Sequence, residues 1–234
     1  MKHSLNAILF TAAIIGAGIG GASASHFITE LFNKNLEIDI FEKNEIGGRL
    51  STIKIEDFEY ESGGAIIHPR NRYMQNFVKL LNLDKRGTVN DGNYGIWNGK
   101  EFVFEESSHF FITFSKLLFR YGLQPLYLNS YINEILKKFE NIYDLQEKNI
   151  GFENVTSMIA GMDPNLVDLL SVSINDHLTN LKYDLKFIDE LVKATLVVNY
   201  GQSTNVQSFV ASVSFAGAGY NLWSVKNGNK EVIE

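Results

Sequence analysis

A run of four glycines between Gly16 and Gly21 is the feature that most constrains the fold. It follows a short apolar segment, residues 12–15, whose β-branched end favours a buried strand. Residues 21–32 then place apolar side chains at helical spacing, and residues 36–41 alternate as a second strand. This order of strand, glycine turn, helix and strand predicts a βαβ unit with a parallel strand pair and a right-handed crossover.

The glycines satisfy the G-x-G-x-x-G pattern of dinucleotide-binding turns. In that pattern Gly16 makes the tight turn, Gly18 lets a pyrophosphate approach the backbone, and Gly21 lets helix and strand pack closely. Glu42 follows the second strand about 20 residues later, where a carboxylate accepts hydrogen bonds from ribose hydroxyls. We therefore predict a cofactor site, the alternative being a glycine-rich turn without a ligand.

A second glycine pair follows directly, in residues 46–52. Gly48 and Arg49 lie close enough to Glu42 in sequence to wrap the same pyrophosphate from its other side. The guanidinium fork of arginine neutralises phosphate in a way that lysine does less well. Simple nicotinamide dehydrogenases do not need a second loop around the pyrophosphate. The alternative to a pyrophosphate-binding loop is a surface turn with a solvated arginine.

Further along, residues 53–61 alternate, residues 72–83 are helical by period, and Asn98-Gly99 suits a type I′ hairpin turn within residues 95–104. After residue 106 the pattern becomes mainly helical. The expected helices there span residues 108–121, 127–143, 153–159, 166–181 and 185–198. The helix 108–121 is either a buried core helix, the wall of an apolar pocket or a membrane-leaning surface. We expect an α/β part before residue 106 and a helical part after it.

Composition excludes several classes of site. The 234 residues carry a net charge of −6, which argues against a nucleic-acid partner. The chain has no cysteine, which removes zinc–thiolate sites, thiol nucleophiles and disulfides. No apolar run reaches the length of a membrane-spanning helix. We find no catalytic triad, and we predict no metal site and assign no catalytic residue.

The glycine motifs, with the Gly63–Gly64 pair after them, resemble those of FAD flavoproteins of the amine-oxidase type. A set of motifs in order narrows the resemblance to the prenylcysteine oxidase family: SGGAIIHP (62–69), FVFEES (102–107), RYGLQ (120–124), NYGQST (199–204) and LWSVKNGNK (222–230). The resemblance implies an FAD site at Gly16, Gly18, Gly21, Glu42, Gly48 and Arg49, with Gly63 and Gly64 at the flavin end.

The same resemblance implies a fold class and a domain plan. The fold expected is α/β, with an FAD-binding Rossmann-type βαβ domain followed by a mainly helical substrate-domain segment. We expect this fold to be incomplete. Residues 1–11 are a leader or a short signal-like segment, 12–106 the FAD-binding domain and 107–234 a partial substrate domain of the prenylcysteine lyase kind. Members of the family continue well past a segment like 222–230, so we expect this chain to be an N-terminal portion.

The reaction implied by the family is oxidation of a prenyl-cysteine thioether. Hydride leaves the allylic carbon beside sulfur for the flavin, water attacks the cation, and free cysteine and a prenyl aldehyde form. Oxygen reoxidises the flavin and yields hydrogen peroxide. The family also implies a lysosomal or secretory route, to which the sequon at Asn154 would then be relevant. Peripheral membrane contact is possible, and the oligomeric state is left open.

Two alternatives stay open from the residues alone. One is another FAD amine oxidase or a desaturase-like enzyme, and the other is a truncated form without catalysis. His68, beside Pro69, is either near the flavin or a structural histidine. The leader is doubtful because the glycine turn begins so close to Met1, and a signal cleaved at 22–24 would remove it.

Overall fold

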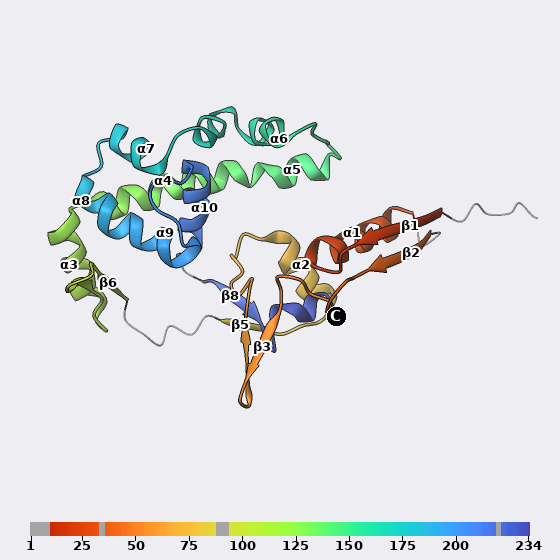
Figure 1. Ribbon diagram of the computed structural model, residues 1–234. Helices are drawn as coiled ribbons and strands as arrows, with labels where there is room; N and C mark the ends of the chain where they lie inside the picture. Colours follow the sequence, from red (N-terminus) through yellow and green to blue (C-terminus); the bar gives the residue numbers. More distant parts are fainter. Residues whose placement is uncertain (1–9, 33–35, 88–93, 219–220) are drawn as a thin grey trace, which may run out of the picture. The chain divides into compact units, whose positions relative to one another are not determined.

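The structure is a computed structural model that describes residues 10–32, 36–87, 94–218 and 221–234. Residue contacts divide the chain into two compact units (Figure 1). The first unit comprises residues 1–88 and 221–234, and the second comprises residues 89–220. The boundary near residue 106 refers to functional domains and stays a prediction, as does the leader 1–11, which lies almost wholly outside the described residues.

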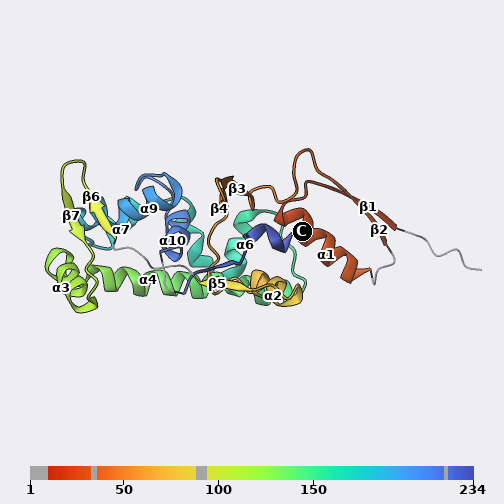
Figure 2. The same cartoon turned by 90° about the horizontal axis from the view of Figure 1, so that it is seen from below.

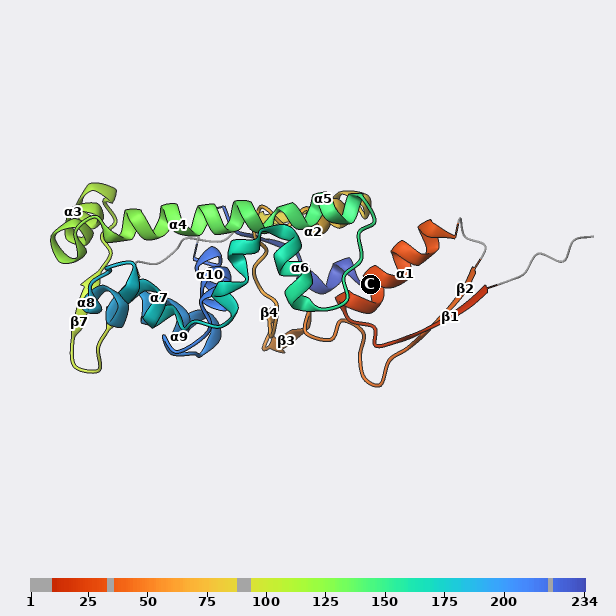
Figure 3. The ribbon, with the colours of Figure 1, turned by 90° about the horizontal axis from the view of Figure 1, so that it is seen from above.

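The first unit begins with the predicted βαβ arrangement. Strand β1 (Phe10–Ile15) pairs in parallel with β2 (Leu36–Phe41), in a register from Phe10 opposite Leu36 to Ile15 opposite Phe41. Helix α1 (Ile19–Leu31) connects them and lies along the pair, as Figures 2 and 3 show. The α/β class with a Rossmann-like start is therefore confirmed.

The alternating residues after this unit form a hairpin. Strands β3 (Thr52–Ile55) and β4 (Phe58–Glu61) pair antiparallel, and the turn places Glu56 at a φ of 54°. Helix α2 (Arg72–Leu80) follows, with the side chain of Asn71 accepting a hydrogen bond from the Met74 N–H at its start.

The end of the chain returns to the first unit, which the sequence patterns did not predict. Strand β8 (Trp223–Val225) pairs antiparallel with β5 (Lys85–Gly87), and the short helix η4 (Asn229–Val232) follows. Their apolar side chains complete a core with α2, made of Ile67, Met74, Val78, Trp223, Val225 and Val232. Burial of these side chains holds residues 221–234 against α2 and Ile67.

The described residues of the second unit, 94–218, are mainly helical apart from the hairpin of β6 (Gly95–Trp97) with β7 (Phe102–Glu105). The hairpin is confirmed, but the type I′ turn is wrong. Only Gly99 of the turn pair has a positive φ, because the Asn98 side chain accepts the N–H groups of Lys100 and Glu101 and shapes a longer loop.

The helices of this unit surround two clusters of buried side chains, a larger one and a smaller one formed by Ile135, Ile159, Met162, Leu166 and Leu169. They are α3 (Phe110–Tyr121), α4 (Gln124–Phe139), α5 (Asn141–Glu147), α6 (Val155–Met162), η1 (Pro164–Leu166), η2 (Asp168–Leu170), α7 (Ile174–Asn180), α8 (Leu185–Phe187), the π-helical η3 (Ile188–Val192), α9 (Lys193–Tyr200) and α10 (Ser208–Ala216). The fully buried side chains of the larger cluster come mostly from α7 to α9. Helix α10 was not predicted, since its serines and alanine interrupt the apolar period.

One helical expectation is wrong, and one of the three alternatives for residues 108–121 fails. The single helix expected over 166–181 is broken into η1, η2 and α7, because Ser173 is extended where it bridges Gln207 and its hydroxyl caps α7 through the Asp176 N–H. The core interpretation of 108–121 also fails. Only Tyr121 of α3 is buried, whereas Phe111 and Phe119 are 81% and 92% exposed. Within the described residues, no helix is long and apolar enough to cross a membrane.

Candidate cofactor-binding site

The turn between β1 and α1 has the geometry that its glycines predict. The Gly16 N–H donates to the Phe41 carbonyl at 2.7 Å, which ties the turn to the end of β2, and Gly16 has a φ of +100°. A Cβ on Gly21 would lie only 1.9 Å from the Gly16 carbonyl oxygen. The helix can therefore approach the turn this closely only with glycine at position 21.

Helix α1 offers an anion site at its N-terminus. Gly18 is its N-cap and supplies no side chain, and no acidic residue lies in its first turn. Helix geometry leaves the first N–H groups without intrahelical acceptors, and the helix dipole places partial positive charge there. Such an end binds phosphate oxygens without help from a cationic side chain.

The second glycine loop lies directly on the first. The Gly47 N–H donates to the Ala17 carbonyl at 2.9 Å, and Gly18 and Gly47 form a parallel bridge. A Cβ on Gly18 would sit 3.7 Å from the Gly47 carbonyl oxygen, and one on Gly48 would sit 3.4 Å from the Gly18 Cα. The two loops are thus joined through the backbone groups of their glycines.

Glu42 is held at the edge of these loops by two backbone amides. One carboxylate oxygen accepts the Asn44 N–H at 2.8 Å and the other accepts the Ala17 N–H at 2.8 Å. Hydrogen bonds first from Asn44 and then from Ala17 lower the pKa of Glu42 below its usual value, so the group is a carboxylate at neutral pH. Each oxygen keeps a lone pair with which to accept a ribose hydroxyl.

The Gly63–Gly64 pair lies against the backbone of Arg49. The Gly64 N–H donates to the Arg49 carbonyl at 2.8 Å, and a Cβ on Gly63 would lie 2.0 Å from the same oxygen. The Arg49 side chain itself is exposed. All eight residues predicted to touch FAD therefore lie in one connected stretch of the first unit, and their roles in binding stay predictions.

The position of His68 gives its ring a local contact. Its Nδ1 accepts the Arg70 N–H at 3.1 Å, and the side chain is half-buried beside the start of α2. This hydrogen bond uses one nitrogen of the His68 ring. A position of His68 near a flavin stays a prediction.

Two residues in this region were missed by sequence reasoning. Asn229 is fully buried and its side chain donates to the Gly64 carbonyl, while its own N–H donates to the Glu61 carboxylate. The motif NGNK, which contributed to the family resemblance, was the signal that could have identified Asn229. No periodicity identifies Glu61, because its partner is 168 residues away in the sequence.

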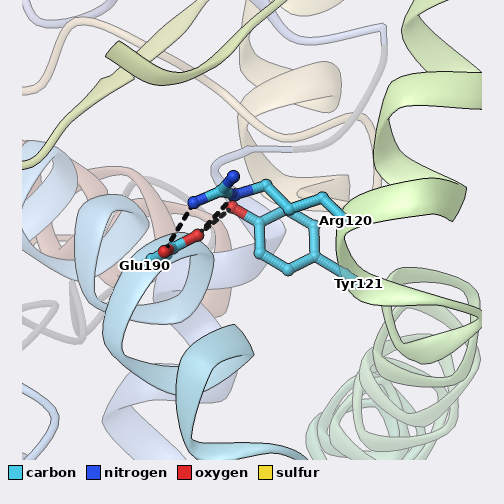
Figure 4. Close-up of polar contacts among 3 residues, drawn as sticks. All are labelled: Arg120, Tyr121 and Glu190. Carbon is cyan, nitrogen blue, oxygen red and sulfur yellow. Dashed lines mark hydrogen bonds and ion pairs between the residues drawn. The ribbon is translucent and has the colours of Figure 1, made fainter. Parts of the chain in front are cut away.

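A separate polar cluster lies in the second unit (Figure 4). The Arg120 guanidinium donates two hydrogen bonds of 2.7 Å to the Glu190 carboxylate, and the Tyr121 hydroxyl donates a third of 2.8 Å. The bond from Arg120 lowers the pKa of Glu190, whereas burial raises the pKa of Tyr121 to about 12. This cluster joins α3 to η3 and lies beside an open groove of about 800 Å³ walled by Phe102, Phe104, Phe111 and Phe119.

Comparison with known proteins gives two matching families. Residues 104–234 match the prenylcysteine lyase family, and residues 14–81 match the NAD(P)-binding Rossmann-like domain. Prenylcysteine oxidase 1 of Mus musculus is 41% identical over 221 residues, and that of Homo sapiens is 40% identical. Prenylcysteine oxidase 1-like of Bos taurus is 38% identical. The match covers 94% of this chain but only about 44% of the first of these relatives, so the chain spans less than half of its length.

Solved structures share the fold at lower identity. Putrescine oxidase superposes with a TM-score of 0.62 at 20% identity, over 97% of this chain and 48% of the enzyme. A fatty acid isomerase from P. acnes superposes with a TM-score of 0.55 at 18% identity, over 98% of this chain and 49% of that protein. These likenesses show that the chain corresponds to about half of such a fold.

Proposed function

The chain belongs to the prenylcysteine oxidase family, and from that premise we propose that its first unit binds FAD and serves oxidation of a prenyl-cysteine thioether. The observation that carries this proposal is the contact between the two glycine loops at Gly18 and Gly47, with Glu42 bound at their edge. The donor set fits the adenosine and pyrophosphate half of a dinucleotide. The free amides of α1 suit the phosphates, and the Glu42 carboxylate suits the ribose.

In the proposed mechanism the protein supplies binding and orientation. Bound FAD supplies the two-electron oxidant that takes a hydride from the carbon beside sulfur. The amides of α1 hold the pyrophosphate, and Arg49 adds positive charge to it from the second loop. The Gly63–Gly64 pair, which packs against the Arg49 backbone, would face the flavin end. Water and oxygen complete the proposed reaction, which releases cysteine, a prenyl aldehyde and hydrogen peroxide.

A titration with FAD tests the binding site. Glu42→Gln keeps the size of the side chain but removes its charge, and Glu45→Gln makes the same change at an exposed glutamate of the same loop. We expect Glu42→Gln to weaken FAD by about 10- to 150-fold, the effect of about 1.5–3 kcal/mol for hydrogen bonds to a charged group. Riboflavin, which lacks the adenosine ribose, should bind both variants equally. Equal FAD affinity in the two variants contradicts the assignment of Glu42.

The substrate proposal needs a separate measurement. Protein loaded with FAD is incubated with farnesyl-cysteine, and free cysteine, peroxide and oxygen uptake are followed. Release of cysteine and peroxide in equal amounts supports thioether oxidation. Turnover of an aliphatic amine alone would favour the amine-oxidase alternative, for which the shared fold of putrescine oxidase is the supporting observation. A protein that remains colourless and inert with FAD present would favour a form without catalysis.

We further propose peripheral membrane contact through α3 and a lysosomal or secretory location. Support for the first comes from the exposed aromatic side chains Phe110, Phe111 and Phe119 on α3, since aromatic residues favour the membrane interface. Support for the second comes from Asn154, which is exposed at the start of α6 and carries the sequon. Flotation with vesicles and a mass shift on deglycosylation, lost in Asn154→Gln, test the two.

A further inference from the structure

Asn229 connects the end of the chain to the Gly63–Gly64 pair. Its side chain is fully buried, and its Nδ2 donates to the Gly64 carbonyl at 2.6 Å while its Oδ1 accepts the Val225 N–H at 2.7 Å. Its backbone N–H donates to the Glu61 carboxylate at 2.6 Å. Asn229 therefore contacts both Glu61 and Gly64, which lie on either side of Ser62 and Gly63.

The segment 228–232 approaches the second glycine loop closely. Gly228 has a φ of +120°, and a Cβ there would lie 3.0 Å from the Thr52 side chain. On the other side, a Cβ on Gly47 would lie 3.9 Å from the Lys230 Cβ. Val232 anchors the segment in the core formed with α2 and β8. The segment therefore packs against the second glycine loop as well as against the glycine pair.

The peptide groups of Gly64 are held from two directions. Its N–H donates to the Arg49 carbonyl, and its carbonyl accepts the Asn229 amide. Glycine has no side chain to anchor it and loses more conformational freedom on folding than other residues. The position of Gly63 and Gly64 must therefore come from the hydrogen bonds that their own N–H and carbonyl groups make with Arg49 and Asn229.

We propose that Asn229 is a positioning residue that holds Gly63 and Gly64 in the arrangement that the flavin end of FAD requires. The proposal rests on the proposed function, because the pair is assigned to the flavin end there. A binding site is effective when hydrogen bonds behind it fix the groups that touch the ligand. Asn229 supplies such bonds from a segment 165 residues away in the sequence.

The test replaces Asn229 with a residue of the same shape. Asn229→Asp keeps an oxygen for the Val225 N–H but exchanges the donor toward Gly64 for an oxygen. Asn227→Asp is the matched control, because it adds the same charge at an exposed position two residues earlier. Where Asn229→Asp does not fold, Asn229→Ser removes the reach of the side chain without adding charge.

Hydrogen–deuterium exchange without any cofactor measures the positioning itself. In Asn229→Asp we expect amide exchange over residues 62–67 to rise by about tenfold, the effect of one lost hydrogen bond, with no change over residues 16–22. The control should exchange like the original protein. Unchanged exchange over residues 62–67 overturns the proposal, whether or not the protein binds FAD.

Titration with FAD and with ADP then separates positioning from general stability. Asn229→Asp should weaken FAD by about tenfold and leave ADP, which lacks the flavin, unchanged. Equal loss of both ligands, together with a lower unfolding midpoint, would show a merely structural role and overturn the proposal, as would FAD affinity equal to that of the control. Failure of the unaltered protein to bind either ligand instead refutes the FAD site, and with it the cofactor part of this proposal.

Discussion

Alanine at Gly21 and alanine at Gly20 form a matched pair that isolates the close contact between α1 and its preceding turn. Both positions lie in the first turn of α1, so each substitution brings the same gain in helix propensity, about 1 kcal/mol. At Gly20 no atom beyond its chain neighbours and the backbone of its own helix lies within 4 Å of the new Cβ. At Gly21 the Cβ would lie 1.9 Å from the Gly16 carbonyl oxygen and 3.3 Å from the Ile14 side chain.

The difference between the two variants is therefore a steric cost. A carbon and a backbone oxygen cannot remain 1.9 Å apart, so the turn or the helix must move. Overpacking of this kind costs about 1–3 kcal/mol. We expect Gly20→Ala to leave the free energy of unfolding unchanged or to raise it by up to about 1 kcal/mol. Gly21→Ala should lie about 1–3 kcal/mol below Gly20→Ala and should bind FAD more weakly.

Trp223 fluorescence during urea unfolding provides the assay for this unit. Trp223 is buried in its core, and the chain has one other tryptophan, Trp97, which is exposed in the second unit and can be replaced by phenylalanine. The two alanine variants are compared in that background. Equal unfolding midpoints and equal FAD affinity would refute the claim that glycine at position 21 is needed for close packing.

Two further outcomes concern the second unit. Glu190→Gln removes the charge that binds Arg120 and should lower the free energy of unfolding by about 1–3 kcal/mol. Glu134→Gln, which breaks the ion pair of Glu134 with Lys138 on α4, should lower it by less than about 0.5 kcal/mol. Equal losses of stability in the two variants refute the importance of the Arg120–Glu190 cluster. Burial lowers the pKa of His177, so the unfolded chain binds more protons below pH 6.5 and stability should fall on acidification through that value. Urea midpoints at pH 7 and pH 5 measure this, and His177→Gln, which keeps a partner for the Tyr131 hydroxyl, should reduce the change; an unaltered pH dependence contradicts it.

Local patterns were sufficient to predict much of the first unit. The glycine spacing and the alternation in residues 36–41 predicted β1, α1 and β2, because strand and helix periods are properties of neighbouring residues. The chemical constraint on glycine also predicted the close contact at Gly21, since only a residue without Cβ fits there. The order of motifs similarly predicted the family to which the chain belongs.

Tertiary structure decided the features that depend on distant partners. The pairing of β8 with β5 and the bond from Asn229 to Gly64 join segments far apart in the sequence, and no local period encodes them. The break within residues 166–181 likewise arises because Ser173 bridges Gln207, a contact that outweighs helical propensity. Residues with weak local preference adopt the conformation in which the rest of the fold can pair with them and bury them. Their conformation is therefore determined only in the folded chain.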